Sequence, residues 1–146
     1  LCRELPALNL PLPFSNAKLV MPGVAAISGT KFLDYAQAEK EMLQLSNSLS
    51  NQQTENLMLL VICDDSAFVA ETENNFLWVT FTRSNPSHDI YGVNSFTTHK
   101  HWGCRGPLII DARIKPHHAP VLVKDPEVEK RIDRLFTKDA VLGKLK

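Results

Sequence analysis

Imidazole, thiol and carboxylate groups gather between positions 99 and 118 of this chain, where they could bind zinc. These residues are His99, His101, Cys104, Asp111, His117 and His118. Imidazole and thiolate are common zinc ligands. The spacing His-x-His-x-x-Cys matches none of the common zinc motifs, however, and adjacent histidines tend to point apart. We therefore favour a solvated loop whose histidines bond to the backbone or to a neighbouring domain, and we expect no metal site.

Cys104 with a histidine and an aspartate is also the residue set of a nucleophilic hydrolase. A chain of 146 residues contains such a set by chance. No Gly-x-Ser-x-Gly elbow, dinucleotide fingerprint or phosphate-binding loop accompanies it in the sequence. We expect neither a catalytic nor a cofactor-binding residue in this chain.

Two cations stand at positions where they could hold an anion or contact another domain. Arg83 ends an apolar helical segment just before the turn Asn85–Pro86. A cation there complements the helix dipole, which is the favoured interpretation for an isolated domain, or it binds a carboxylate. Lys115 follows an apolar strand, and strand ends face ligand crevices in many α/β folds. A solvated lysine remains the default expectation.

Short apolar runs predict the strands that position these residues. The run LMLLVIC, at 57–63, ends in Asp64–Asp65, as expected for a strand buried on both faces and followed by a turn. Further strands are predicted at 24–28, 90–93 and 108–114.

Capping residues and apolar periodicity predict three helices. Asp34 with Gln37 forms a capping pair, followed by an apolar face at Ala38, Met42, Leu45 and Leu49. A second helix starts at Thr72 or Glu73 and places Leu77 and Phe81 four residues apart. A third starts at Asp125–Pro126, with Val128, Ile132 and Leu135 on its apolar face.

These elements predict an α/β (or α+β) fold, a layered sheet of about four to five strands with helices packed on it. Residues 1–23 contain four prolines and are expected to form an extended linker segment. Residues 24–137 would form the domain, and 138–146 a loose tail.

Composition excludes several classes of protein. Lysine and arginine balance aspartate and glutamate, so nucleic acid and anionic membrane surfaces are not the expected partners. Three widely spaced cysteines do not suggest a disulfide framework and favour a reduced, cytoplasmic setting. The sequence shows no signal peptide and no run of about 18 apolar residues. The chain begins at Leu1 without an initiator methionine, which suggests a fragment or a processed product.

Taken jointly, several motifs resemble the C-terminal part of the UbiD family of decarboxylases. They are Leu8–Pro11, the strand ending in Asp64–Asp65, Leu77–Trp78, Thr82–Arg83, Pro86 with Asp89, Asp111–Ala112 with Lys115, and Asp125–Val128. Arg113 stands where many members have threonine. The segment 95–106, with HKHWGC, looks like the branch associated with menaquinone biosynthesis.

This resemblance implies a parent enzyme that removes CO2 non-oxidatively from an aromatic or α,β-unsaturated acid, in quinone biosynthesis. Prenylated FMN, a divalent metal and the catalytic Glu-Arg-Glu set would belong to preceding domains, since no residue here matches them. This chain would be the C-terminal lid and assembly domain, packed on the flavin-binding domain of the same polypeptide in a homo-oligomer. It would be inactive and flavin-free alone. In the whole enzyme, His99, His101 and Trp102 would form a lid over the substrate pocket.

Two other classes of function remain open. The chain could be a stand-alone protein-binding or assembly module with no enzyme around it. A zinc-binding domain is the less favoured alternative.

Overall fold

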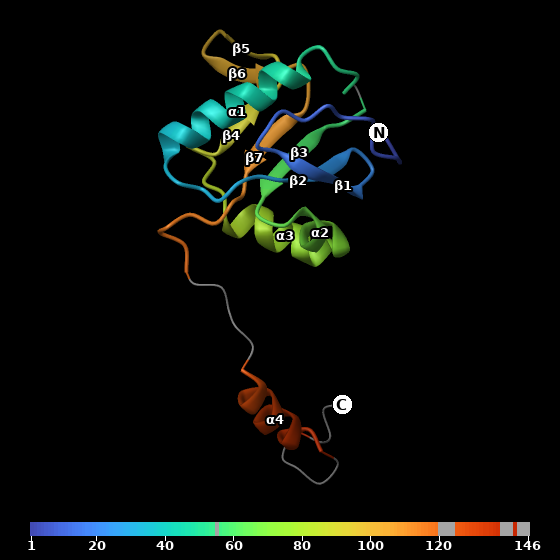
Figure 1. Cartoon of the computed structure of the whole chain (residues 1–146), viewed down its shortest axis with the longest axis vertical. Coiled ribbons are helices and arrows are strands. Elements are labelled where there is room, and N and C mark those ends of the chain that lie inside the picture. Colours follow the sequence, from blue (N-terminus) through green and yellow to red (C-terminus); the bar gives the residue numbers. More distant parts are fainter. Residues whose placement is uncertain (55, 120–124, 138–141, 143–146) are drawn as a thin grey trace.

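The computed structural model, which describes residues 1–54, 56–119, 125–137 and 142, is a mixed α/β fold, as predicted (Figure 1). Its elements in chain order are β1 (Ser15–Met21), β2 (Val24–Ser28), α1 (Tyr35–Leu49), β3 (Leu59–Cys63), α2 (Ser66–Glu71), α3 (Glu73–Thr82), β4 (Ile90–Gly92), β5 (Ser95–Thr98), β6 (His101–Cys104), β7 (Leu108–Asp111) and α4 (Pro126–Leu135).

A five-stranded sheet in the order β1-β2-β3-β7-β4 forms the centre of the fold. The three inner strands are parallel, with Val61 of β3 opposite Ala26 of β2 and Ile110 of β7. The edge strands β1 and β4 run antiparallel to their neighbours. Residues 60–63 of β3 are fully buried, which explains why this strand reads as a continuous apolar run.

Helix α1 covers one face of the sheet (Figure 1). Its first turn is capped by Asp34, whose carboxylate accepts a hydrogen bond from the Gln37 N–H at 2.8 Å. The predicted apolar face of α1 packs against Leu60 and Ile62 of β3. The capping prediction and the apolar face are therefore both confirmed.

Helices α2 and α3 cover the opposite face, where Val69, Phe76 and Val79 pack against β3. The six-residue α2 was not predicted; Asp65 caps it by accepting from the Ala67 and Phe68 N–H groups. Thr72 caps α3, as predicted. The spaced residues of α3, however, point outward: Leu77, Trp78 and Phe81 remain 49%, 45% and 69% exposed.

The proline-rich first segment takes part in the fold more than a linker would. Residues 15–21 form edge strand β1, which the sequence did not predict. Before it, Leu5, Leu8 and Leu10 pack against the α1 side of the core. The Gln52 side chain fixes this stretch because it accepts from the Asn9 N–H and donates to the Asn9 carbonyl.

Helix α4 lies apart from the sheet, beyond α2 and α3 (Figure 1). Asp125 caps it and Pro126 occupies its first turn, as predicted. None of its residues is buried, and Val128, Ile132 and Leu135 are 44–47% exposed. The predicted tail at 138–146 falls outside the described residues except for Leu142.

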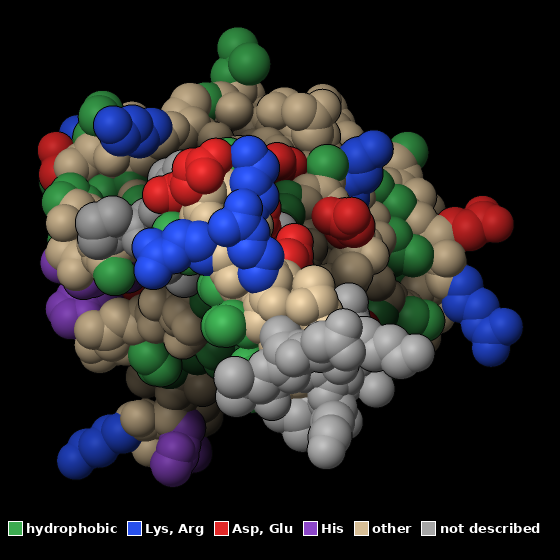
Figure 2. Space-filling view, turned by 90° about the horizontal axis from the view of Figure 1, so that it is seen from below, with side chains coloured by type: hydrophobic (Ala, Val, Ile, Leu, Met, Phe, Trp, Pro, Cys, Tyr) green, Lys and Arg blue, Asp and Glu red, His purple; other side chains and the backbone are tan. Residues whose placement is uncertain are grey.

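Charged side chains of both signs lie next to one another on the face seen from below (Figure 2). This mixture agrees with the zero net charge of the sequence. Among the helices in the described part of the chain, none has the length and apolarity needed to cross a bilayer.

Candidate functional site

Residues 95–104, expected to be a loop, form a two-stranded hairpin of β5 and β6 beside the main sheet (Figure 1). Its turn is His99–Lys100, both with positive φ, 52° and 66°. Two consecutive residues with positive φ are what a tight hairpin turn requires, because that backbone twist matches the twist of the strands. The prediction of a loop at 95–104 was therefore wrong. Because this hairpin has no buried face, its sequence lacks the apolar alternation by which strands are recognised.

The structure places the three expected lid residues together on this hairpin. His99 lies in the turn, while His101 and Trp102 begin β6. Both histidines are exposed, and Trp102 is half-exposed. The hairpin therefore presents both imidazoles outward, while the Trp102 indole is covered on one side.

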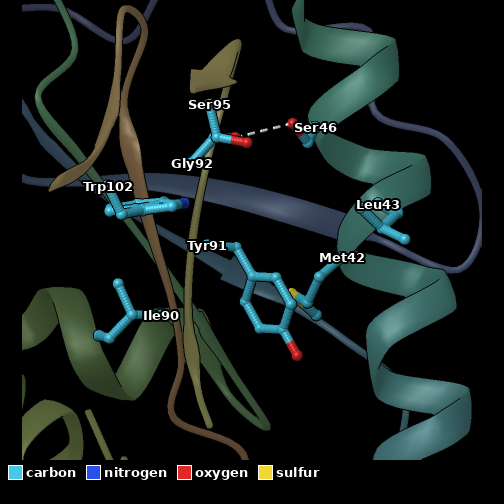
Figure 3. Close-up of a pocket in the computed structure, with 8 residues that line it drawn as sticks. All are labelled: Met42, Leu43, Ser46, Ile90, Tyr91, Gly92, Ser95 and Trp102. Carbon is cyan, nitrogen blue, oxygen red and sulfur yellow. Dashed lines mark hydrogen bonds between the residues drawn. The ribbon is translucent and has the colours of Figure 1, made fainter. Parts of the chain in front are cut away.

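A small pocket of about 90 Å³ lies between this hairpin, β4 and α1 (Figure 3). Trp102 and Tyr91 line it from the strand side, and Met42 and Ser46 from α1. The Ser46 hydroxyl donates to the Gly92 carbonyl at 3.0 Å, which ties α1 to the end of β4. The pocket is too small for a drug-sized ligand, so we interpret it as the packing joint of the hairpin.

Gly92 allows the hairpin to sit close to the sheet. A Cβ at this position would lie 2.5 Å from the Cys104 Cβ and 3.2 Å from the Trp102 ring. Any side chain there would push the hairpin away. The position of Trp102 thus depends on a glycine that sequence reasoning missed.

The side chains around this joint are not poised for proton transfer. Burial raises the pKa of Tyr91 to about 12, with the charges of Asp111 and Asp89 adding to the effect. Burial also raises the pKa of the Cys104 thiol, whose Sγ donates to the Gly106 carbonyl. Cys104 therefore lacks the thiolate character of a nucleophile.

A second group of polar residues lies at the other end of β7, around Arg113. Its guanidinium bonds Asp111 through Nε and Nη2, at 2.9 and 2.8 Å, and Glu41 through Nη1, at 2.6 Å. Arg113 and Asp111 are 1% exposed and Glu41 6%. Burial alone would lower the pKa of Arg113, but its bonds to the two carboxylates hold it above its ordinary value. This cluster ties α1 to the end of β7.

Lys115 is buried, so the default expectation of a solvated lysine was wrong. Its ammonium is 3.4 Å from the Asp89 carboxylate and donates to the Asp111 and Arg83 carbonyls at 2.8 and 3.1 Å. Asp89 in turn accepts from the Asn85 N–H. These oxygens of its own chain enclose the ammonium, which leaves little of it for an external anion or another domain.

Arg83 follows α3 as its C-terminal cap residue, and its side chain is 14% exposed. The guanidinium lies 3.3 Å from Asp64 and 4.8 Å from the centre of the Trp78 ring. Asp64 also accepts from the Ile114 N–H at 2.9 Å. Arg83 therefore joins the ends of α3, β3 and β7, and it lines a cleft.

The structure separates the residues considered for zinc. His99, His101 and Cys104 lie on the hairpin, whereas Asp111 and the two adjacent histidines lie at the far end of β7. His118 accepts a hydrogen bond from the Lys115 N–H through Nδ1. Within the described residues, no three His, Cys, Asp or Glu side chains are grouped as metal ligands would be.

The non-local partners of these cations were missed from the sequence. Of these partners, Glu41 could have been found from the sequence. It lies beside Met42 on the apolar face of α1, and a buried charge there needs a partner of opposite charge. Asp89 belongs to the motifs quoted for the family resemblance. Its pairing with Lys115, however, joins residues far apart in the chain, so no local sequence pattern indicates it.

The fold is an open α/β sheet with helices on both faces. The chain is also similar in sequence to two known proteins. No family model matches the chain. The chain is 32% identical over 75 residues to a 4-hydroxybenzoate decarboxylase subunit of Chlamydia pneumoniae, covering 51% of this chain and 13% of that protein. It is 27% identical over 137 residues to an uncharacterized protein of Chlamydia muridarum, covering 91% and 23%.

Among solved structures, the UbiD-class enzyme HmfF of Pelotomaculum thermopropionicum, in complex with FMN, matches with a TM-score of 0.47 and 18% identity, covering 75% of this chain and 25% of that one. The chain thus spans less than a quarter of the length of the curated relatives that it matches. The chain is therefore similar, over about half of its length, to a small part of a 4-hydroxybenzoate decarboxylase subunit.

Proposed function

We propose that this chain is the C-terminal lid and assembly domain of a UbiD-like enzyme that decarboxylates an aromatic or α,β-unsaturated acid without oxidation. The observation that carries this proposal is the sequence match to the 4-hydroxybenzoate decarboxylase subunit, of which the chain spans only a small part. A cytoplasmic role in quinone biosynthesis is part of the same proposal.

Prenylated FMN and a divalent metal would be held by the preceding flavin-binding domain. The described residues of this chain do not fit either group. They offer no cluster of three metal-ligating side chains, and their buried cations, Arg113 and Lys115, are paired within the chain. We therefore assign no chemical step to this chain, whose part is positioning.

The β5–β6 hairpin is the part of the domain best suited to act as a lid. It is a separate two-stranded unit with a tight turn, and it carries a half-exposed Trp102. An aromatic side chain on such a unit can close over a planar substrate and exclude water from it. His99 and His101 would flank the same opening.

The assembly role is supported by apolar side chains that this chain leaves uncovered. Leu77, Trp78 and Phe81 on α3 and the apolar stripe of α4 are exposed. Uncovered apolar faces of this kind mark contacts with other domains or subunits. The flavin-binding domain and a second copy of the polypeptide are the proposed partners.

The proposal is tested by comparing three proteins: the full-length parent polypeptide, the parent without this chain, and this chain alone. We expect CO2 release from the first only, in the presence of prenylated FMN. The chain alone should show no flavin absorbance after purification. Turnover or flavin retention by the isolated chain would contradict the proposal that the preceding domains bind the flavin and carry out catalysis.

A stand-alone assembly module is the second candidate, favoured by the uncovered stripe of α4. The reading frame that encodes the chain separates the two. Several hundred codons upstream of Leu1 would support an enzyme domain, whereas a start codon next to Leu1 would support a module.

A further inference from the structure

Helix α4 exposes an apolar face. Val128, Ile132 and Leu135 are spaced by four and three residues, so they form one stripe along the helix. A helix of ten residues is only marginally stable in water on its own. The stripe and the shortness of α4 together indicate that this helix is stabilised by packing against another surface.

A second exposed apolar face lies on α3. Leu77, Trp78 and Phe81 point outward from this helix. Phe68 of α2 continues the same face, since its ring lies edge to face against that of Trp78, with the centroids 6.4 Å apart. We call these four side chains the α3 patch. An apolar patch of this kind marks contact with another protein surface.

The charges at the ends of α3 and α4 are complementary when the two helices lie antiparallel. Both helices are ten residues long. α3 has Glu73 in its first turn and Arg83 at its C-terminal end, and α4 has Glu127 in its first turn and Arg134 in its last. Antiparallel packing brings Arg134 near Glu73 and Glu127 near Arg83, whereas parallel packing would bring like charges together. Antiparallel helix dipoles also attract one another.

The connection between β7 and α4 favours packing of α4 onto another copy of the chain. In one chain α4 lies apart from α3 (Figure 1). Pro116, Pro120 and Pro126 occur along the connection and at its end, and residues 107–142 include no glycine. Prolines restrict the backbone and disfavour a compact reversal onto α3 of the same chain. Ten residues, 116–125, can span up to about 35 Å, which is enough to reach a neighbouring copy.

We propose that α4 of one copy packs antiparallel on the α3 patch of a second copy, so that two copies exchange their C-terminal helices. The apolar stripe of α4 would cover Leu77, Trp78 and Phe81. A twofold arrangement makes this contact twice. The doubling matters because stable interfaces bury about 1,200 to 2,000 Å² in total. This inference deepens the assembly role proposed above and rests on that part of the proposed function.

The test measures the molar mass of the 146-residue chain over a dilution series, by light scattering coupled to gel filtration. At high concentration we expect the mass to approach twice the 16.4 kDa of one chain. Phe81→Lys and Ile132→Glu should each reduce it to the mass of the monomer, because each change alters one side of both contacts. An equal mixture of the two variants should regain the dimer. In that mixed dimer one contact keeps both native surfaces, and the other sets two introduced charges of opposite sign against each other.

Met58→Lys and Lys130→Glu are the matched controls, and both should remain dimeric. Met58 is exposed just before β3, at the end of that strand away from Arg83. Lys130 lies on the side of α4 opposite the apolar stripe. Circular dichroism checks that each variant is folded. If Phe81→Lys unfolds the chain, Leu77→Lys takes its place in the same experiment.

Each alternative arrangement gives a result that would overturn the exchange. A wild type that stays monomeric at every concentration indicates that α4 packs on its own chain or on nothing. A dimeric Phe81→Lys indicates pairing of two α4 helices, and a dimeric Ile132→Glu indicates pairing of two α3 patches. A mixture that remains monomeric also contradicts the exchange. Since the experiment involves no CO2 release, its failure would leave the decarboxylase proposal standing.

Discussion

Arg113 organises the largest cluster of buried charge in the described part of the chain. Its guanidinium is shared between a carboxylate two residues away, Asp111, and one on a distant helix, Glu41. A buried ion pair adds little stability in itself, but removing one partner leaves the others charged in an apolar interior. The cluster should therefore be intolerant of single changes.

Replacing Arg113 with methionine should lower the free energy of unfolding by about 3 to 5 kcal/mol, because Asp111 and Glu41 lose their counter-charge. Urea denaturation followed by circular dichroism measures this change. The same replacement at the exposed Arg105 is the control and should change stability by less than about 0.5 kcal/mol. A loss of under about 1 kcal/mol at position 113 would contradict this role.

His118 should make stability depend on pH. Burial lowers its pKa from the ordinary 6.5, with the charges of His117 and Lys115 acting in the same direction. The unfolded chain therefore takes up a proton more readily than the folded chain, and stability falls as pH drops through about 6.5 and below. Melting temperatures at several pH values from 8 to 5 test this prediction.

His118→Gln should reduce that loss of stability at low pH, since no titrating group remains at position 118. The same replacement at the exposed His99 is the control and should leave the pH profile as in the wild type. Identical profiles for the wild type and His118→Gln would show that the lowered pKa of His118 does not affect stability.

At the scale of elements, the sequence predicted what depends on local signals. Asp34, Thr72 and Asp125 marked three helix starts, and apolar runs marked β2, β3, β4 and β7. Strand β1 was missed because its apolar residues do not alternate and prolines precede it. Helix α2 is too short for a periodic pattern, and the exposed hairpin has no buried face to reveal it.

The hairpin should detach when Gly92 gains a side chain. Gly92→Ala places a Cβ against Cys104, and relief of this clash should cost about 1 to 3 kcal/mol of stability. A red shift in Trp102 emission, seen in a Trp78→Phe background, would report loss of its packing. Adding Cys104→Gly removes the opposing atoms and should restore the spectrum, whereas an unshifted Gly92→Ala spectrum would refute this account of the joint.

The apolar stripe of α4 should hold copies of the polypeptide together. Ile132→Glu should shift the molar mass of the full-length protein in solution toward that of the monomer, because a charge replaces an apolar contact. Light scattering coupled to gel filtration measures this shift. Arg131→Glu on the same helix is the control, and an unchanged mass for Ile132→Glu would remove α4 from the assembly surface.

For the whole molecule, the lid proposal concerns Trp102. In the full-length parent enzyme, Trp102→Ala should lower kcat/KM by about tenfold or more, because an aromatic contact over the substrate is lost. Flavin content should remain unchanged, since the proposal assigns the flavin to the preceding domain. His88→Ala, away from the hairpin, serves as the control; wild-type rate and substrate preference in Trp102→Ala would rule out the lid.

The motifs quoted for the family resemblance mark residues that hold the fold together, and they do not mark a binding site. Lys115 pairs with Asp89, which precedes β4, and donates to the Asp111 carbonyl at the end of β7, so these residues hold β7 beside β4. Their types were visible in the sequence, but their burial was not. The cleft after β3 was equally hidden, since Asp64, Trp78 and Arg83 meet only when the sheet and its helices form.

The two edges of the sheet limit how the polypeptide can associate. β1 pairs with β2 in an interrupted register, with Asn16 at a positive φ of 51° and Lys18 beside the first irregularity. β4 has only three residues. Broken or short edges are poor templates for adding strands from another chain. Growth into fibrils by sheet extension is thereby disfavoured, and side-chain surfaces on the helices and the hairpin are left as the means of recognition.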